Sequence, residues 1–402
     1  MAAGDPPKPA SHIAAVAHVP IDEIGSNGGA ARRRFLKGAA AVAGGAGLAA
    51  FPMVAVAQSP IVLRFQGAWS ARDIFHEYAL DYARRVIDMT GGRVRIEVLA
   101  AGAVVKPQDL LDAVSKGALD GCHATPALWA GRNSAFSLFG AGPAIGMDAN
   151  QLLAWVRYGG GSALYQELYE RSLNKPVVGF LYGPMPGQPL GWFKNAINAS
   201  AQFRGLKLRA VGLWADLYRE MGAAVSELPA DEIVAALGRG ALDAAAYSNP
   251  TSDRQLGLPG AADVCMMQSF HAPAQVFEIL YNKKRYEAFS AELKAIVRHA
   301  AEAASADLSW KAAHRYAADY ADMREKRQAR FVKTPAEILR AQLKAWSAVA
   351  AAKSRDNPVF EKVFESQLAW ARRAVGWSLE AAADPRLAYD HWHSGKSGTA
   401  KK

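Results

Sequence analysis

The sequence has very little cysteine and lacks the short motifs that carry common catalytic chemistry. Cys122 and Cys265 are the only cysteines among 402 residues, and neither stands in a metal-binding pattern. Two buried free thiols are the simpler expectation, although an oxidising compartment would also allow a disulfide. The sequence contains no G-x-S-x-G elbow, H-E-x-x-H helix or phosphate-binding loop. We therefore expect no catalytic residue, no resident metal and no cofactor.

A concentration of charge of one sign is also missing. The 47 Lys and Arg residues are scattered among 37 Asp and Glu residues, for a formal net charge of +10. No basic stripe is interleaved with aromatic residues, so a solvated surface accounts for this charge better than nucleic-acid binding does. With 51% hydrophobic and 21% charged residues, the composition is that of a soluble globular protein. The length suggests two domains.

Long hydrophobic runs are absent beyond residue 57, so no later segment is apolar enough to span a bilayer. Before that point, Arg32–Arg34 precede an apolar stretch rich in Ala and Gly that ends in Ala-Val-Ala. This order is typical of an export signal, and the paired arginines resemble the twin-arginine type. A membrane anchor is the alternative, but the stretch is short and interrupted by Pro52. We expect a leader over residues 1–57, cleavage after Ala57 and a periplasmic protein.

The rest of the chain alternates between strand and helix patterns. Apolar residues recur at helical spacing in some segments and alternate with polar residues in others, which distinguishes helices from strands. The predicted order is a strand at 61–69, a helix at 72–89, a strand at 93–100, a helix at 106–120 and a strand with a turn at 121–131. This βαβαβ order predicts a parallel sheet.

A second group of elements repeats part of the first. We predict a helix at 149–171, strands at 175–183, 190–195 and 206–211, helices at 213–221 and 230–239, and a strand at 241–249. The segment DLLDAVSKGALDGCHAT resembles DEIVAALGRGALDAAAYS, a weak internal echo of two similar lobes. Beyond them the sequence is rich in Ala and helical, with one long helix expected at 291–328 and others at 335–381.

These patterns predict an α/β protein with the two-lobed fold of a periplasmic binding protein (type II-like), with mixed sheets and a long helical C-terminal region. Such proteins close two lobes over a solute about a hinge. We expect lobe I mainly at 58–182, lobe II mainly at 183–270, lobe-crossing and C-terminal helices at 271–385, and a disordered tail at 386–402.

Arg209 lies near the carboxyl end of a predicted strand, just before the turn at Gly212 that leads into a helix. In open α/β sheets, ligands bind at that end of the strands. A guanidinium presents a planar pair of donors that matches a carboxylate. Arg209 is therefore a candidate anion ligand, and the alternative is a salt bridge to a neighbouring acidic side chain.

Several segments resemble the periplasmic solute-binding subunit of TRAP (tripartite ATP-independent periplasmic) transporters, the DctP-like family. They are KPQDLLDAVSKGALDGCHA, GLKLRAVG, MGAAVSELPADEIVAALGRGALDAA and EILYNKK, in the order of the family, and the resemblance covers residues 60–330. It is greatest to the branch that binds 2-oxo acids and lactate-like monocarboxylates. The resemblance implies that the protein captures a small organic carboxylate, clamped by Arg209, and delivers it to membrane permease subunits.

The resemblance also implies further substrate-binding residues. Gln188 and Trp192 keep the spacing of a Gln that faces the site and helps to hold a cation, followed four residues later by a Trp. Trp69 follows the first strand, where family members present an aromatic residue to the site. Phe270 lies in SFHAPA, which matches a loop that enters the cleft. For each of them, a core or loop position is the alternative.

Two stretches depart from this branch. In DAAAYSNP, Ala246 and Tyr247 stand where the branch has Glu and Trp, and an alanine side chain offers a cation no oxygen ligand. We therefore expect no metal between protein and substrate, while Tyr247 can still contact the substrate. In HATPALWAG, Ala127 and Leu128 replace two tyrosines that hydrogen-bond the substrate. The expected ligand is a bulkier or more apolar carboxylate than pyruvate.

Two other functions fit the same sequence. An exported enzyme is the rival from another class, although the sequence lacks a catalytic constellation. A stand-alone carboxylate sensor would share the fold and the sequence pattern of a transporter subunit. The helices at 335–381 are expected to span both lobes or to mediate a homodimer.

Overall fold

The computed structural model describes residues 59–140, 142–326 and 329–393. The predicted leader at 1–57 and residues 394–402 of the predicted tail lie outside these ranges. Within them, no helix is both long and apolar enough to cross a membrane.

The strands of the described residues are β1 (Ile61–Gly67), β2 (Val94–Leu99), β3 (Gly121–Ala124), β4 (Val177–Met185), β5 (Gly191–Phe193), β6 (Lys207–Arg209), β7 (Ala224–Ser226), β8 (Ala244–Ala245), β9 (Val264–Met267), β10 (Gln275–Asn282) and β11 (Arg330–Lys333). The α-helices are α2 (Ile74–Met89), α3 (Leu110–Lys116), α4 (Ala149–Tyr158), α5 (Gly161–Glu167), α6 (Leu213–Glu220), α7 (Ala230–Gly238), α8 (Pro250–Leu256), α9 (Lys283–Glu287), α10 (Ala291–Lys326), α11 (Ala336–Asp356), α12 (Pro358–Ala381) and α13 (Pro385–His393).

The first lobe is built on a five-stranded sheet with the order β2-β1-β3-β10-β4. β1 pairs in parallel with both β2 and β3, which confirms the predicted βαβαβ unit. β10 is antiparallel to β3 and β4 and returns to this sheet from much later in the chain. Every residue of β10 is buried, so no polar alternation marks it as a strand in the sequence.

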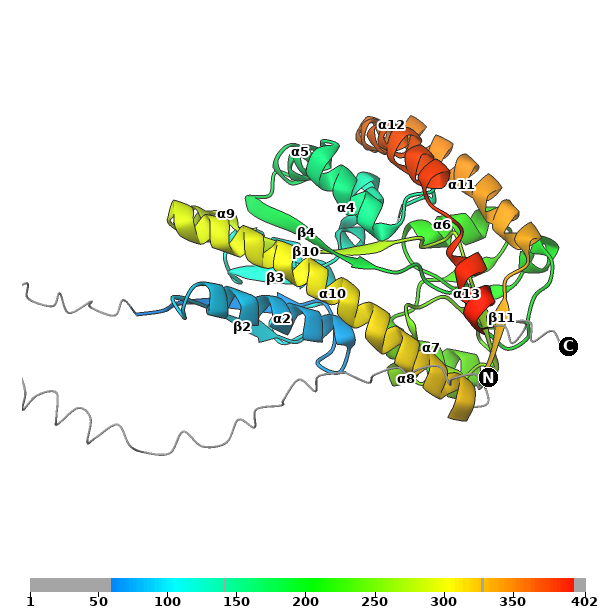
Figure 1. Cartoon of the computed structure of the whole chain (residues 1–402). Coiled ribbons are helices and arrows are strands. Elements are labelled where there is room, and N and C mark those ends of the chain that lie inside the picture. The colour runs from blue at the N-terminus through cyan, green and yellow to red at the C-terminus, as the bar shows by residue number, and fades with distance from the viewer. Residues whose placement is uncertain (1–58, 141, 327–328, 394–402) are drawn as a thin grey trace, which may run out of the picture. The chain divides into compact units, whose positions relative to one another are not determined.

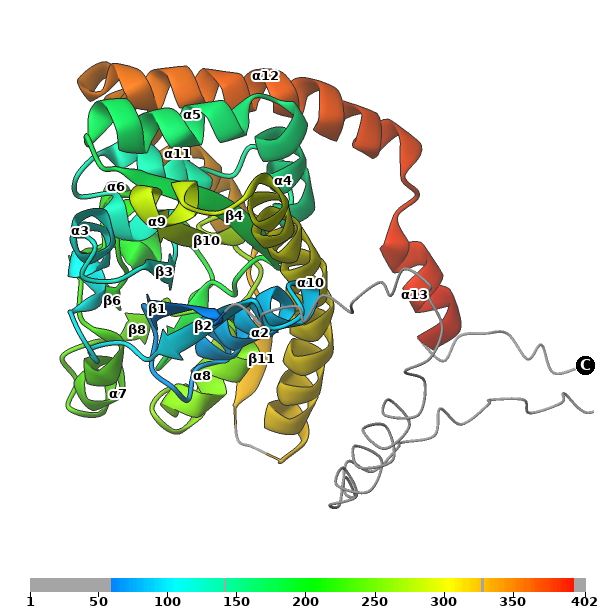
Figure 2. The ribbon, with the colours of Figure 1, turned by 90° about the vertical axis from the view of Figure 1, so that its left-hand side faces the viewer.

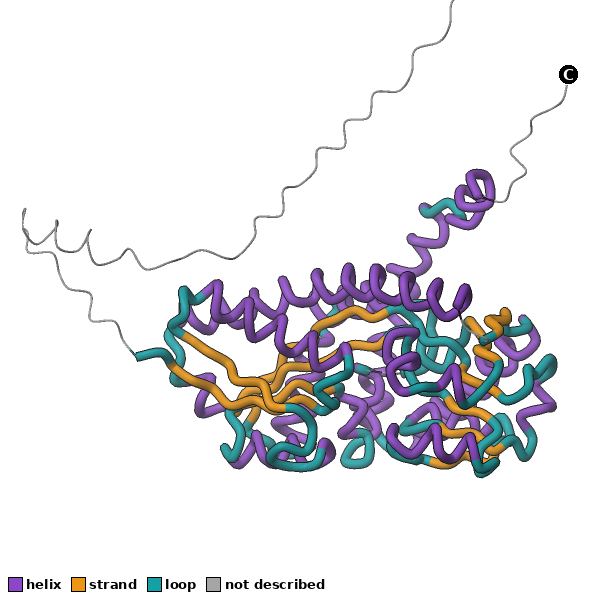
Figure 3. Tube along the Cα trace, turned by 90° about the horizontal axis from the view of Figure 1, so that it is seen from below, coloured by secondary structure: helices purple, strands orange, loops and turns teal. Residues whose placement is uncertain are grey.

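The second lobe is built on a six-stranded sheet with the order β11-β9-β5-β8-β6-β7. β6 pairs in parallel with β7 and β8, while β5 is antiparallel to β8 and β9. The strands form two separate groups with helices packed over them (Figure 3). Two mixed sheets with helices around each confirm the predicted two-lobed α/β fold.

The internal echo in the sequence corresponds to one construction used in both lobes. Asp120 accepts a hydrogen bond from the backbone N–H of Arg64 on β1 (2.8 Å), and Asp243 accepts one from that of Lys207 on β6 (3.1 Å). Both aspartates come three residues after a glycine in the left-handed conformation (φ 79° and 78°), which ends the preceding helix. Each Gly-Ala-Leu-Asp segment therefore ties the entry of its strand to the neighbouring strand.

The chain crosses between the lobes along several segments. Residues 186–190 connect β4 to β5, and residues 268–274 connect β9 back to β10. α10 is 36 residues long and packs against α2 and β4 in the first lobe and against α8 in the second (Figure 1). α11 packs on α6 of the second lobe, while α12 packs on α4 and α5 of the first (Figure 2). This pair therefore also spans both lobes, which is one of the two expectations for the helices at 335–381.

Two predicted segments differ from the structure. The single helix expected at 149–171 is divided into α4, α5 and a π-helical turn, because glycines at 159–161 interrupt it. The disordered tail expected from residue 386 is wrong for residues 386–393, which belong to α13. Asp384 accepts a hydrogen bond from the N–H of Arg386 (2.9 Å), and a proline follows Asp384 at the first helical position, which is a helix-start signal.

The two cysteines and one acidic residue lie in the core. Cys122 in β3 and Cys265 in β9 are both buried and free, as predicted. Glu278 on β10 accepts hydrogen bonds from Nε1 of Trp129 (2.5 Å) and from the hydroxyls of Tyr165 (2.5 Å) and Tyr169 (2.6 Å). Burial raises the pKa of Glu278 to about 7 in spite of these three bonds.

We expect the variant Glu278→Gln to change how stability depends on pH. The folded-state pKa of about 7 lies above the ordinary 4.5, so the folded protein binds an extra proton between these values. The contribution of Glu278 to the free energy of unfolding is therefore full below pH 4.5 and is lost as the pH rises through about 7. Urea unfolding at about pH 5 and about pH 8 measures the difference between the two proteins, in which the contributions of other groups cancel. The wild type should lose stability relative to the variant at the higher pH, and a difference independent of pH would contradict the assignment.

Candidate functional site

A cavity of about 450 Å³, here called the cleft pocket, lies between the two lobes. From the first lobe it is lined by Trp69, Phe75, Thr125, Ala127, Leu128, Ala130, Gly131 and Ser137, and from the second by Arg209, Val211, Gly212, Leu213, Trp214, Glu227, Ala230, Tyr247 and Ser248, with Gln275 at the start of β10. The cleft pocket thus brings together three of the predicted substrate-binding residues, which come from three separate segments. They are Trp69, Arg209 and Tyr247.

Arg209 is the last residue of β6, and only 6% of its surface is exposed. Its Nε donates a hydrogen bond to the carbonyl oxygen of Leu228 (3.0 Å), and its Nη1 donates one to that of Ala246 (3.0 Å). The guanidinium carbon lies 5.8 Å from the ring centroid of Tyr247, within reach of a cation–π contact. These contacts fix the plane of the guanidinium and leave Nη2 without an acceptor among the described residues.

Arg209 has no acidic partner within 4.0 Å in the described part of the chain, so the salt bridge considered as its alternative role is absent there. Burial lowers the pKa of the Arg209 guanidinium to about 10, against smaller opposing effects of Tyr247 and Glu227. The side chain therefore keeps its positive charge at neutral pH. Because a buried charge without a partner is costly, the arrangement suits an anion that enters the pocket.

The N-terminus of α6 lies at the same cavity. Gly212 is its N-cap residue and has no side chain to bond the first amides of the helix, and Leu213 and Trp214 follow it along the pocket wall. Gly212 has a φ of 56°, which glycine adopts without strain. The amides at a helix N-terminus, together with the helix dipole, attract negative charge. Arg209 and the first turn of α6 therefore face one space, although Oε2 of Glu227 already accepts a bond from the N–H of Gly212 (3.3 Å).

Hydrogen bonds from the second lobe reach Asp73 of the first lobe beside the cleft pocket. Asp73 caps α2 by accepting a bond from the N–H of Phe75 (3.0 Å). The hydroxyl of Ser252 donates to its Oδ1 (3.1 Å) and the hydroxyl of Tyr247 to its Oδ2 (3.5 Å). Burial raises the pKa of Asp73 even though these three bonds lower it. The contacts hold the lobes together next to the cavity.

Gln188 and Trp192 lie behind the cleft pocket rather than in its lining. Nε2 of Gln188 donates to Oε1 of Gln275 (2.6 Å), a pocket-lining residue. Nε1 of Trp192 donates to Oδ2 of Asp253 (2.8 Å), and Oδ1 of Asp253 accepts a bond from the N–H of Ser248 in the lining (3.1 Å). Gln188 therefore bonds a lining residue directly, whereas Trp192 reaches the lining through Asp253.

Phe270 lies in the crossing segment and lines a different cavity, together with Gln188. Its N–H donates to Oε1 of Gln342 (2.9 Å), and its carbonyl oxygen accepts a bond from Nε1 of Trp346 (2.6 Å). These two bonds hold the segment that contains Phe270 against α11. Ala246 is fully buried and contributes its carbonyl oxygen to Arg209, and within the described ranges no group of three or more His, Cys, Asp or Glu is arranged to hold a metal.

Sequence reasoning missed several lining residues. Phe75 and Trp214 are each the second residue of a helix that follows a strand, α2 after β1 and α6 after β6. A search for aromatic residues in the first turn after each predicted strand end would have found both. Glu227 and Gln275 carry no such signal, because one follows the short strand β7 and the other starts a fully buried strand.

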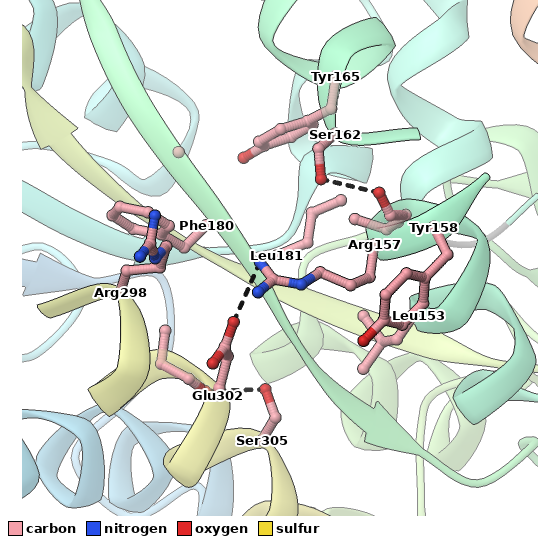
Figure 4. A pocket seen from close by; sticks show the side chains of 13 residues that line it. Leu153, Arg157, Tyr158, Ser162, Tyr165, Phe180, Leu181, Arg298, Glu302 and Ser305 are labelled. Carbon is pink, nitrogen blue, oxygen red and sulfur yellow. Dashed lines mark hydrogen bonds and ion pairs between the residues drawn. The ribbon is translucent and has the colours of Figure 1, made fainter. Parts of the chain in front are cut away.

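A second cavity, of about 520 Å³, lies between α4, β4 and α10 (Figure 4). Nη1 of its Arg157 pairs with Glu302 at 3.2 Å, one of the dashed contacts in the figure. Its lining comes from residues 153–181 and 298–305, and none of these residues belongs to the second sheet. Because Arg157 already has an acidic partner and no residue of the second sheet lines this cavity, we assign the candidate solute site to the cleft pocket.

A cavity between two α/β lobes, with a buried cation and crossing segments behind it, defines the class of two-lobed solute-binding proteins. The comparison with known families agrees with this class. The chain belongs to the DctP family, the bacterial extracellular solute-binding proteins of family 7, and the match covers residues 65–356.

Among curated proteins, the chain is similar to the monocarboxylate 2-oxoacid-binding periplasmic protein of Nostoc sp. The two are 34% identical over 218 residues, which make up 54% of this chain and 59% of that relative. The match therefore spans less than two thirds of the relative's length.

Among solved structures, the chain shares its fold with TRAP solute-binding proteins. One, from Bordetella bronchiseptica, was solved as a dimer of mixed occupancy with copurified calcium and picolinate; it is 24% identical, with a TM-score of 0.76 over 83% of this chain and 97% of that one. Another, from Colwellia psychrerythraea, was solved with bound calcium and pyruvate; it is 23% identical, with a TM-score of 0.76 over 83% of this chain and 100% of that one.

The bond between Ser252 and Asp73 should favour the closed form. For any solute that binds the wild type, we expect Ser252→Ala to raise the dissociation constant about fivefold, since one hydrogen bond contributes roughly 1 kcal/mol. Isothermal titration calorimetry measures this change. Ser305→Ala is the matched control, because the hydroxyl of Ser305 donates to the carbonyl of Ala301 within α10 (2.9 Å). Equal effects of the two substitutions would contradict a role for Ser252 in closure.

Proposed function

We propose that the protein captures a small organic monocarboxylate in the cleft pocket and delivers it, in the periplasm, to the permease subunits of a TRAP transporter. One observation carries this proposal. Arg209 is a buried cation at the cavity, its plane is fixed by two carbonyl oxygens, and its Nη2 has no acceptor among the described residues. A carboxylate of the solute supplies the missing charge and acceptor together.

The charges around the pocket support a single carboxylate. Glu227 also lines the cavity, but its Oε1 pairs with Nη2 of Arg219 at 2.7 Å. Arg209 is then the one uncompensated charge of the described lining, and it balances one negative charge of the solute. The relatives agree in kind, because the Nostoc protein is named for monocarboxylate 2-oxo acids and the Colwellia protein was solved with pyruvate.

The remaining candidate residues have distinct proposed roles. Trp69 and Tyr247 contact the solute as pocket walls, while Gln188 and Trp192 position Gln275 and the Ser248 backbone behind it. For Phe270, contact with the solute stays a sequence-based expectation. Export through the twin-arginine-type segment is likewise a proposal, supported by the arginine run and the small residues that end the apolar stretch.

Replacing Arg209 tests the proposed function directly. Arg209→Ala should raise the dissociation constant for a monocarboxylate by at least thirtyfold, because an unpaired anion in a closed site costs roughly 2–5 kcal/mol. Calorimetry with the acid that most raises the melting temperature of the wild type, chosen from a panel that includes pyruvate, gives the measurement. The control is Arg254→Ala, whose arginine pairs with Asp319 at 2.7 Å on α10 and not with the solute. Undiminished affinity of the Arg209 variant would refute the proposal.

We also propose that the protein forms a homodimer through its C-terminal helices. Large apolar side chains at the end of α12 and on α13 are strongly exposed: Trp377 (74%), Leu379 (77%), Leu387 (72%), Tyr389 (62%) and Trp392 (78%). Figure 2 shows this end of α12, followed by α13, extending away from the two sheets. Exposed apolar groups of this size indicate a contact with another chain, and the Bordetella relative was solved as a dimer.

The homodimer makes a prediction about mass in solution. Size-exclusion chromatography with light scattering should give a dimer for the wild type and a monomer for the double variant Trp377→Ser with Trp392→Ser. Each substitution removes a large apolar side chain from the proposed interface. Trp310→Ser is the control, because Trp310 on α10 is 69% exposed and lies outside these helices. A monomeric wild type, or a dimer that survives the double substitution, would contradict the proposed interface.

A further inference from the structure

The walls of the cleft pocket away from Arg209 are mainly apolar. Trp69 and Leu128 line the pocket from the first lobe, and Leu213 and Trp214 line it from the second. Leu128 keeps 37% of its surface exposed, so a large apolar side chain is left partly unpacked at the cavity. A solute that covered this surface would gain the free energy of burying it.

Two of the walls are indole rings held in place by other rings. Trp69 meets Phe75 and His123 edge to face, with centroids 5.2 and 5.0 Å apart. Trp214 meets His271 edge to face at 5.1 Å. Rings fixed in advance lose little freedom when a solute binds, and aromatic solutes gain additional stabilisation from stacked or edge-to-face contacts with them. The walls are therefore preorganised for a ring.

The size of the pocket points to a solute larger than pyruvate. A volume of about 450 Å³ equals that of roughly fifteen water molecules, at about 30 Å³ each. A three-carbon acid would fill less than half of this space and leave the apolar walls in contact with water. The pocket has room for an acid of roughly ten to fifteen non-hydrogen atoms, counted as one atom per water volume.

We infer that the solute is an aromatic monocarboxylate, with its carboxylate on Arg209 and its ring against Trp69, Leu128 and Trp214. This inference rests on the proposed function and narrows its substrate class. A dicarboxylate fits less well, because the described lining holds no second arginine or lysine to pair with a second carboxylate.

Four small probes separate the contributions of the carboxylate, of the ring and of its aromatic character. Propionate supplies the carboxylate alone, 3-phenylpropionate adds the ring, 3-cyclohexylpropionate replaces the ring by a saturated one, and 3-phenylpropanamide keeps the ring without the charge. Calorimetry on the full mature chain should show that 3-phenylpropionate binds at least tenfold tighter than propionate and at least threefold tighter than the cyclohexyl acid. The amide should bind at least tenfold more weakly than 3-phenylpropionate.

A matched pair of variants tests where the ring lies. Leu128→Trp fills the cavity beside the predicted ring and should lower the affinity for 3-phenylpropionate at least tenfold, so that its advantage over propionate shrinks. Leu343→Trp is the control, because Leu343 on α11 is 38% exposed, close to the 37% of Leu128, and does not line the cleft pocket. Thermal unfolding without ligand checks that both variants fold.

The possible failures are distinguishable. If propionate or pyruvate binds and 3-phenylpropionate binds no tighter, the aromatic class is wrong and the proposed function stands. If 3-cyclohexylpropionate binds as tightly as 3-phenylpropionate, the pocket selects an apolar group of any kind rather than an aromatic ring, and the inference is overturned. If the amide binds as tightly as 3-phenylpropionate, the carboxylate role of Arg209 fails, and the proposed function fails with it. An equal loss of affinity in the Leu128 and Leu343 variants overturns the position assigned to the ring.

Discussion

The buried charge of Arg209 is the constraint on which the rest of the site depends. A guanidinium at 6% exposure loses most of its hydration, and two carbonyl oxygens recover only part of the cost. Those carbonyls belong to Leu228 and Ala246, which lie beyond β7 and β8, so the neighbouring strands of the second sheet must be in register for the charge to be tolerated. The fold thus fixes one donor plane and leaves its outer edge for a solute.

The two lobes are assembled on a shared plan that places this edge at a cleft. In each lobe a helix ends at a left-handed glycine, and an aspartate three residues later bonds the neighbouring strand, Asp120 in the first lobe and Asp243 in the second. The loops that follow the parallel strands of both lobes line the cleft pocket, with Trp69 and Thr125 from the first lobe and Val211 and Tyr247 from the second. The crossing segments and α10 connect the lobes behind the pocket, and the bonds to Asp73 join them beside it.

The sequence alone predicted the elements that position the site better than the contacts inside it. Alternation and the turn at Gly212 located Arg209 at a strand end, and the same reasoning gave the parallel unit of β1, β2 and β3. It could not place Gln188 and Trp192, because their hydrogen-bond partners, Gln275 and Asp253, are 87 and 61 residues away. Spacing within one segment says which residues share a face, but not which residue of another segment covers them. The fully buried strand β10 was missed for a related reason, since burial on both faces removes the polar alternation.

Acidic groups near the pocket are arranged so that they do not neutralise Arg209. Glu227 is paired with Arg219, and Glu278 and Asp253 lie in the interior of the two lobes, where burial raises the pKa of each to about 7. Around neutral pH both buried carboxyls are therefore partly protonated. Their remaining role is structural, because Glu278 bonds the indole of Trp129, next to Leu128 in the lining, and Asp253 bonds the backbone of Ser248. The lobes thus support the pocket walls with acids that are buried and hydrogen-bonded or paired with another arginine, and the positive charge of Arg209 stays available to the solute.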